Sequence, residues 1–161
     1  MNNKQKYKIL LNISIGSAIL FLVLSFSAML FYSGGSMVNN PKNPLYNESN
    51  LSYSHIYNFF SDLGLHTSWS GDSNSISLIL FSYSLLFVAI ELVAFYWAFH
   101  YILKKDNNLI NISRLGFCVA LVSALGFIMV GLFPSDTMFN LHMFAVNLAF
   151  RAFLLVMLIY S

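Results

Sequence analysis

The chain has 161 residues, of which 58% are hydrophobic and only 9% are charged, and its net charge is +2. Soluble domains usually carry about a quarter charged residues, so this composition excludes an ordinary soluble globule and predicts an integral membrane protein. The small and scattered positive charge excludes a nucleic-acid-binding surface. The single cysteine, Cys118, excludes an intramolecular disulfide and a cysteine-rich metal site.

Long apolar stretches predict an all-α fold, a polytopic transmembrane helical bundle that forms a single membrane domain over residues 1–161. Each stretch is long enough to cross a hydrocarbon core about 30 Å thick at about 1.5 Å per residue. The four predicted spans are 9–31, 76–103, 115–133 and 141–160. The sequence after the first span does not resemble a signal-peptide cleavage site, so we expect this span to be retained.

Three of these spans carry a stripe of small or polar residues on which a neighbouring helix can pack closely. The stripes consist of Ser14, Ala18 and Ser25 in the first span, Ser77, Ser84, Glu91 and Ala98 in the second, and Gly116, Ala120, Ala124 and Gly131 in the third. We expect the stripe of the second span to face protein, because a carboxylate that points at lipid costs several kcal/mol.

The first two spans are separated by a long polar loop, residues 33–75. Its glycines and prolines predict irregular chain in the first half. In the second half, an apolar face at helical spacing consists of Tyr53, Ile56, Tyr57 and Phe60. We therefore predict an amphipathic interfacial helix near 53–63, ended by Gly64 in the left-handed conformation.

The basic residues predict the orientation in the membrane. Those near span ends all fall on one side of the predicted topology, namely Lys4, Lys6, Lys8, Lys104, Lys105 and Arg114. Because cytoplasmic loops carry the excess of lysine and arginine, we expect a multi-pass protein of the cell membrane with a cytoplasmic N-terminus. The loop 33–75 and the turn after the third span then face outward, where Tyr32, Tyr53 and Trp69 are expected to form an aromatic belt.

Polar residues gather in two short segments that this topology places on the same outer side. The candidate cluster consists of Asn58, Ser61, Asp62, Gly64 and His66 in the loop, and Pro134, Asp136 and His142 around the last turn. The favoured interpretation is structural. Asp62 and Ser61 would cap backbone groups of a local helix or turn, and Asp136 would cap the fourth span. His142 would hydrogen-bond Asp62 or Asp136 to hold the loop down.

Two functional interpretations of the same cluster stay open. One is a pocket that binds a cation, a lipid headgroup or a proton. The other is a metal-dependent lipid hydrolase, which needs three or four converging ligands. The sequence predicts no metal site and no cofactor, because no histidine pair at helical spacing accompanies His142.

Two charged residues lie inside the predicted spans, Glu91 in the second and Arg151 in the fourth. Helical rise places them at depths that differ by roughly 7 Å, which a long arginine side chain and helix tilt can bridge. We predict a buried ion pair that fixes helix register, with Asn147 on the same face as Arg151. The alternative is an ion or proton path, because intramembrane charges are often functional.

The placed motifs resemble the family of prokaryotic polytopic proteins called domain of unknown function 998, and more distantly the DRAM and FGF-receptor-activating-protein-like family. The resemblance rests on the segment from Asn58 to Gly64, on the segment from Gly131 to Asp136, and on His142. It implies about six spans and no particular activity. We therefore expect this chain to be a truncated form of a six-span fold.

We predict a non-enzymatic membrane protein whose outer polar pocket binds a lipid headgroup or a small amphiphile. Its expected partners are membrane lipids and no nucleic acid, together with a second copy of the chain or further C-terminal helices. A metal-dependent intramembrane lipid hydrolase is the first alternative. A transporter or channel element that uses Glu91 and Arg151 is the second.

Overall fold

The computed structural model describes residues 3–37, 52–104 and 109–161. These residues form four long helices, α1 (Asn3–Leu30), α2 (Ser75–Leu103), α3 (Ile110–Leu132) and α4 (Phe139–Tyr160), and one short 3₁₀ helix, η1 (Phe60–Gly64). Each long helix is apolar and long enough to cross a membrane, which confirms the predicted all-α bundle with four spans. The helices begin two to six residues outside most of the predicted spans, because polar end turns continue the helical hydrogen bonding.

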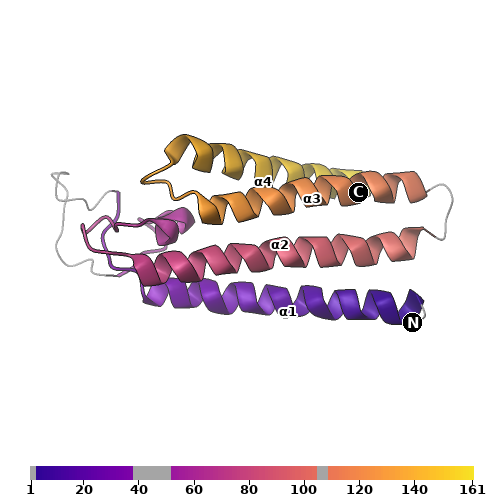
Figure 1. The fold of residues 1–161 in the computed structure, drawn as a ribbon, viewed down its shortest axis with the longest axis horizontal. Coiled ribbons are helices and arrows are strands. Elements are labelled where there is room, and N and C mark those ends of the chain that lie inside the picture. Colours follow the sequence, from indigo (N-terminus) through magenta and orange to yellow (C-terminus); the bar gives the residue numbers. More distant parts are fainter. Residues whose placement is uncertain (1–2, 38–51, 105–108) are drawn as a thin grey trace.

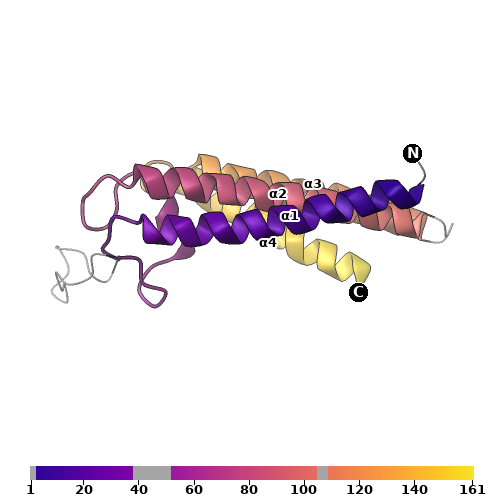
Figure 2. The ribbon, with the colours of Figure 1, turned by 90° about the horizontal axis from the view of Figure 1, so that it is seen from below.

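The helices form a row in chain order, in which α1 packs on α2, α2 on α3 and α3 on α4 (Figure 1). The η1 helix and the turn between α3 and α4 lie together at one end of the bundle, which we call the loop end. The C-terminal end of α2 and the start of α3 lie at the opposite end, together with the start of α1. The predicted placement of both polar segments at one end is confirmed. Figure 2 shows that α4 crosses the other helices at an angle, so that its C-terminal half diverges from α1.

The predicted small-residue stripes do face protein. Ser14 and Ser25 are buried on α1, which packs on α2. On α2, the buried members of the stripe are Ser77, Ser84 and Ala98, while Glu91 is only partly buried. Small side chains let two helix backbones approach closely, so these stripes set where the helices meet.

On α3, glycine and serine residues make close contacts with both neighbouring helices. A Cβ atom added to Gly126 would lie 2.6 Å from the backbone nitrogen of Ala149 on α4. One turn away, the Ser123 hydroxyl donates to the Ala149 carbonyl at 2.9 Å. Toward α2, the Ser82 hydroxyl donates to the carbonyl of Gly131 at 2.7 Å. Gly126 was not among the residues predicted to form the packing surface.

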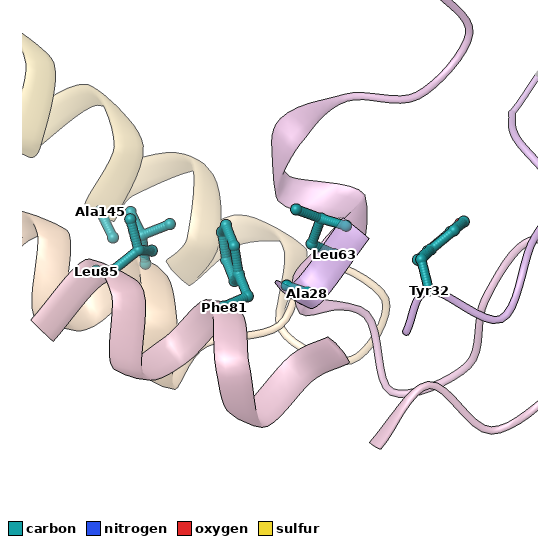
Figure 3. Close-up of a cluster of buried hydrophobic side chains, with 7 residues drawn as sticks. Ala28, Tyr32, Leu63, Phe81, Leu85 and Ala145 are labelled. Carbon is teal, nitrogen blue, oxygen red and sulfur yellow. The ribbon is translucent and has the colours of Figure 1, made fainter. Parts of the chain in front are cut away.

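The core at the loop end joins η1 to the helices. It consists of Ala28, Tyr32, Leu63, Phe81, Leu85, Val130 and Ala145 (Figure 3). The ring of Phe81 lies against Gly64, where an added Cβ would come within 2.6 Å of the ring. The predicted left-handed Gly64 is wrong, because only Gly34, Gly35 and Gly71 have positive φ among the described residues. Glycine is required at position 64 because a side chain there would collide with the Phe81 ring.

The predicted interfacial helix over 53–63 is also wrong. Only Phe60–Gly64 is helical there, as a 3₁₀ turn. Side chains bind the backbone N–H groups that a helix would use, since Asn58 accepts from the Ser54 N–H at 3.0 Å and Asp62 accepts from the Phe59 N–H at 3.0 Å. Short polar side chains compete with helical hydrogen bonds in this way, and they fold the segment into turns.

Candidate functional site

Residues 58–67 form a cap over the loop end, which we call the roof, and the buried side chain of Asn74 holds it to the bundle. The Asn74 amide nitrogen donates to the carbonyls of Leu63 at 3.1 Å and Leu65 at 3.0 Å. Its amide oxygen accepts from the Ser33 N–H at 3.3 Å. The Ser77 hydroxyl adds a bond of 3.0 Å to the same Leu63 carbonyl. Because buried carbonyls need hydrogen-bond partners, these bonds fix the position of the roof relative to the start of α2.

Within the roof, Asn58 and Asp62 form a local hydrogen-bonded pair. The Asn58 amide nitrogen donates to Asp62 Oδ2 at 3.0 Å and to the Gly35 carbonyl at 2.9 Å. Asp62 Oδ2 also accepts the Phe59 N–H, so Asp62 caps the η1 turn. The predicted capping role of Asp62 is therefore confirmed.

Burial dominates the electrostatics of Asp62, whose side chain is only 4% exposed. Desolvation raises the pKa of the Asp62 carboxyl, and its contacts with Asn58, the Phe59 N–H and Trp69 oppose that rise. Burial also raises the pKa of the Tyr32 and Tyr53 hydroxyls, and the nearby charge of Asp62 adds to both shifts. A carboxylate in these surroundings is stabilised by a positive charge that enters the site.

Asp136 ties the roof to the turn between α3 and α4. Its Oδ2 accepts the backbone N–H groups of His66 at 2.9 Å and Thr67 at 3.1 Å, and its Oδ1 lies 3.6 Å from His66 Nδ1. The predicted cap of the fourth span by Asp136 is wrong, because α4 begins after Met138 without a side-chain cap. Asp136 tethers a segment about seventy residues away in sequence, a pairing that local motifs do not reveal.

His142 lies on the first turn of α4 and faces the protein, with 3% of its surface exposed. Its Nδ1 lies 2.7 Å from the Phe133 carbonyl. The predicted bond from His142 to Asp62 or Asp136 is therefore wrong. The ring instead holds the α3–α4 turn, in which Pro134 follows the end of α3 and its carbonyl accepts the Met138 N–H at 2.8 Å.

Between the roof and the start of α4 lies a cavity of about 580 Å³, which we call the head cavity. Its described lining consists of Met37, Phe59, Ser61, Asp62, Leu65, Thr67, Trp69, Ser135, Asp136, Phe139, His142, Met143 and Val146. Four of the predicted cluster residues, Ser61, Asp62, Asp136 and His142, therefore share one cavity. Asn58, Gly64, His66 and Pro134 are not among its lining residues, although Asn58 binds Asp62 and His66 contacts Asp136.

A second cavity of about 570 Å³ lies next to the first, among the helices of the bundle, and we call it the trough. The two share Phe59, Ser61 and Val146. Otherwise the trough is lined by apolar residues of all four helices and by one acid, namely Phe21, Phe60, Phe81, Leu85, Val88, Glu91, Leu92, Phe127, Val130, Phe150 and Phe153. From Phe81 to Glu91 it follows α2 for about 15 Å, which is about half the thickness of a hydrocarbon core.

The predicted ion pair between Glu91 and Arg151 is not formed. Glu91 lines the trough, whereas Arg151 is exposed and lines a groove on the other side of α4, together with Asn147. Among the described residues, the salt-bridge geometry found is that of His66 and Asp136 alone. Arg151 lies nine residues after His142, on the opposite side of α4, and His142 faces inward. Arg151 therefore faces outward.

The geometry also bears on the alternative of a metal-dependent hydrolase. In the part of the chain that the structure describes, no group of three histidine, cysteine, aspartate or glutamate side chains could hold a metal ion.

Three important residues were missed or misplaced by the sequence interpretation. Asn74 precedes the second span, where it looks like an ordinary helix cap, yet its side chain makes no cap hydrogen bond. Tyr32 is buried in the core and Trp69 lines the head cavity, so neither belongs to a lipid-facing belt. In the structure, the indole N–H of Trp69 is buried and makes no hydrogen bond, which the sequence does not indicate.

Scans against protein-family models, curated proteins and solved structures find no match to this chain. The resemblance to the domain of unknown function 998 family therefore stays a prediction. The fold itself defines the class, a multi-pass α-helical protein of membrane type. Within that class, the particular feature of this chain is a cavity under the roof, lined by Asp62, Asp136 and His142 among apolar side chains, that lies beside an apolar trough.

Proposed function

We propose that this protein binds a single-chain amphiphile, with the headgroup in the head cavity and the hydrocarbon chain in the trough. The observation that carries the proposal is that the two cavities are adjacent and share Phe59, Ser61 and Val146. Each cavity falls in the range of about 300–1,000 Å³ that is usual for small-molecule sites. The head cavity contains the polar side chains of Asp62, Asp136 and His142, whereas the trough is lined by apolar side chains apart from Ser61 and Glu91, so the two cavities suit the two ends of an amphiphile.

The helix row supports this proposal. The trough lies between Phe21 of α1 and Phe150 and Phe153 of α4, although these helices do not pack together as neighbours in the chain do. A hydrocarbon chain placed there would cover aromatic surface that the protein leaves uncovered. At about 25 cal/mol per Å² of apolar surface, such coverage stabilises the complex by several kcal/mol.

We also propose that the loop end faces the outside of the cell membrane and that the protein acts without turnover. The orientation rests on Lys4, Lys104 and Arg114, which all belong to the opposite end of the bundle. Asp62 and Asp136 hold backbone groups, which is typical of a binding site with a fixed geometry.

Native mass spectrometry of the full-length protein, released from detergent micelles, tests this proposal by the lipid that stays bound. Val146→Phe places a ring at the junction of the two cavities, so we expect bound lipid to fall at least tenfold. Val122→Phe is the matched control, because Val122 lines the groove on the other side of α4. Equal retention of lipid by both variants would overturn the proposal.

A further inference from the structure

Two buried side chains of the head cavity each have an atom that can accept a further hydrogen bond. Asp62 accepts its hydrogen bonds through Oδ2, and its Oδ1 accepts none from the residues that the structure describes. The indole N–H of Trp69 interacts with this carboxyl but makes no hydrogen bond of standard geometry. One oxygen of a carboxylate that is only 4% exposed is therefore available to a ligand.

His142 supplies the second acceptor. A carbonyl oxygen can only accept, so Nδ1 of His142 must carry the hydrogen that binds the Phe133 carbonyl. In the neutral ring Nε2 is then an acceptor, and no described residue donates to it. This ring is 3% exposed and lines the head cavity, so a ligand there can reach Nε2.

The rest of the lining determines which headgroup suits these acceptors. Asp136 adds a second carboxylate, and none of the described lining residues is a lysine or an arginine. Aromatic rings of Phe59, Trp69 and Phe139 complete the walls. Such surroundings favour a positive charge through the carboxylates and the ring faces, and they repel an anionic headgroup. Unpaired acceptors further favour a headgroup with N–H donors.

We infer that the head cavity selects amphiphiles with a primary ammonium headgroup, which donates hydrogen bonds to Asp62 Oδ1 and His142 Nε2. This inference rests on the proposed amphiphile-binding function and names the class of its ligand. A quaternary ammonium carries the same charge but has no N–H group, so it leaves both acceptors unpaired. A neutral headgroup lacks the charge, and a sulfate or phosphate is repelled by both carboxylates.

The test uses the full-length protein in phosphatidylcholine nanodiscs, with Trp69 fluorescence as the signal. The chain has two tryptophans, and Trp97→Phe leaves Trp69 as the reporter inside the head cavity. The probes are dodecylammonium, dodecyltrimethylammonium, dodecyl sulfate and the short propylammonium. We expect dodecylammonium to bind at least tenfold more tightly than dodecyltrimethylammonium and dodecyl sulfate, because a charged hydrogen bond contributes about 1.5–3 kcal/mol. Propylammonium makes the same hydrogen bonds but lacks the long chain, so it should also bind at least tenfold more weakly.

Two variants separate binding from folding. Asp62→Asn should abolish the preference for dodecylammonium over dodecyltrimethylammonium, and Asp72→Asn is the matched control because Asp72 is exposed and lies outside the cavity. If Asp62→Asn does not fold, His142→Gln replaces it, since its amide can still donate to the Phe133 carbonyl while it lacks the second ring nitrogen.

The outcomes distinguish a failure of the headgroup inference from a failure of the amphiphile-binding function. Equal binding of all three dodecyl probes would overturn the headgroup inference and leave the amphiphile-binding function standing. Equal binding of propylammonium and dodecylammonium would overturn the amphiphile-binding function, because the trough would then contribute nothing. Tighter binding of dodecyl sulfate, or a preference that survives in both variants, would also overturn the inference.

Discussion

The two ends of the bundle are held together by different kinds of contact. At the end opposite the roof, aromatic rings fill the space, since Tyr160 stacks on Tyr96 with ring centroids 5.5 Å apart and meets Phe99 edge-on at 5.0 Å. Its hydroxyl donates to the Ser113 carbonyl at 3.0 Å. At the loop end, hydrogen bonds from Asn74 and Asp136 hold a roof above a cavity.

The two ends therefore differ in how the structure is stabilised and in whether a ligand can bind. Ring stacking and small-residue contacts make a filled core, whereas side-chain bonds to backbone groups keep a space open without collapse. Removal of a polar side chain should therefore change the free energy of unfolding little at the filled end and strongly at the loop end. Three substitutions and one change of pH test this comparison.

Removal of the Asn74 side chain should have the largest effect. Asn74→Ala leaves the buried carbonyls of Leu63 and Leu65 with fewer partners and should lower the free energy of unfolding by about 3 kcal/mol. Unfolding in increasing SDS, followed by circular dichroism, measures this change. The control is Asn147→Ala, whose exposed amide binds only its own helix, and it should change stability by less than about 0.5 kcal/mol. Similar losses in both variants would contradict the central role of Asn74.

A methyl group at Gly126 should separate α3 from α4. Gly126→Ala meets the Ala149 backbone at 2.6 Å and should cost about 2 kcal/mol, because a packed backbone cannot yield locally. Gly16→Ala is the matched control, since nothing lies within 4 Å of its added Cβ, and it should be neutral or stabilising. Thermal unfolding of the two variants in one detergent provides the comparison, and equal melting temperatures would refute the close contact.

Loss of the Asp136 tether should loosen the roof by a smaller amount. Asp136→Ala removes the acceptor of two backbone N–H groups at a half-buried site, so a loss of about 1 kcal/mol is expected. Hydrogen exchange is the direct measurement, because the amides of His66 and Thr67 should lose protection while those of α2 keep theirs. Unchanged protection at both amides would show that the tether is dispensable.

Acid should stabilise the wild-type protein relative to Asp62→Asn. The pKa of the Asp62 carboxyl is raised by burial, so its contribution to stability is fully present below its unfolded pKa and is lost as the pH rises through the raised value. The difference in unfolding free energy between wild type and Asp62→Asn should therefore shift toward the wild type as the pH falls from neutral. Tyr32 and Tyr53, which face Asp62, titrate far above this window. A constant difference would contradict the burial argument.

Local patterns predicted the helices and their packing stripes because hydropathy and helical period depend on neighbouring residues alone. The roof could not be predicted, since its shape depends on Asn58 and Asp62, which bind backbone groups that a helix would otherwise use. The cluster residues were found, but their partners were not. Asp136 binds amides contributed by a distant segment, and the side of α4 that Arg151 occupies follows from contacts such as Gly126 with Ala149.

The row arrangement of the helices determines how a ligand could arrive. Because α1 and α4 both line the trough without packing on each other as the neighbouring helices do, we expect a ligand to enter sideways between them. A molecule already dissolved in one leaflet could diffuse in the plane of the bilayer and enter without crossing water. Occupancy would then follow the mole fraction of that molecule in the membrane, and its concentration in the aqueous phase would have little influence.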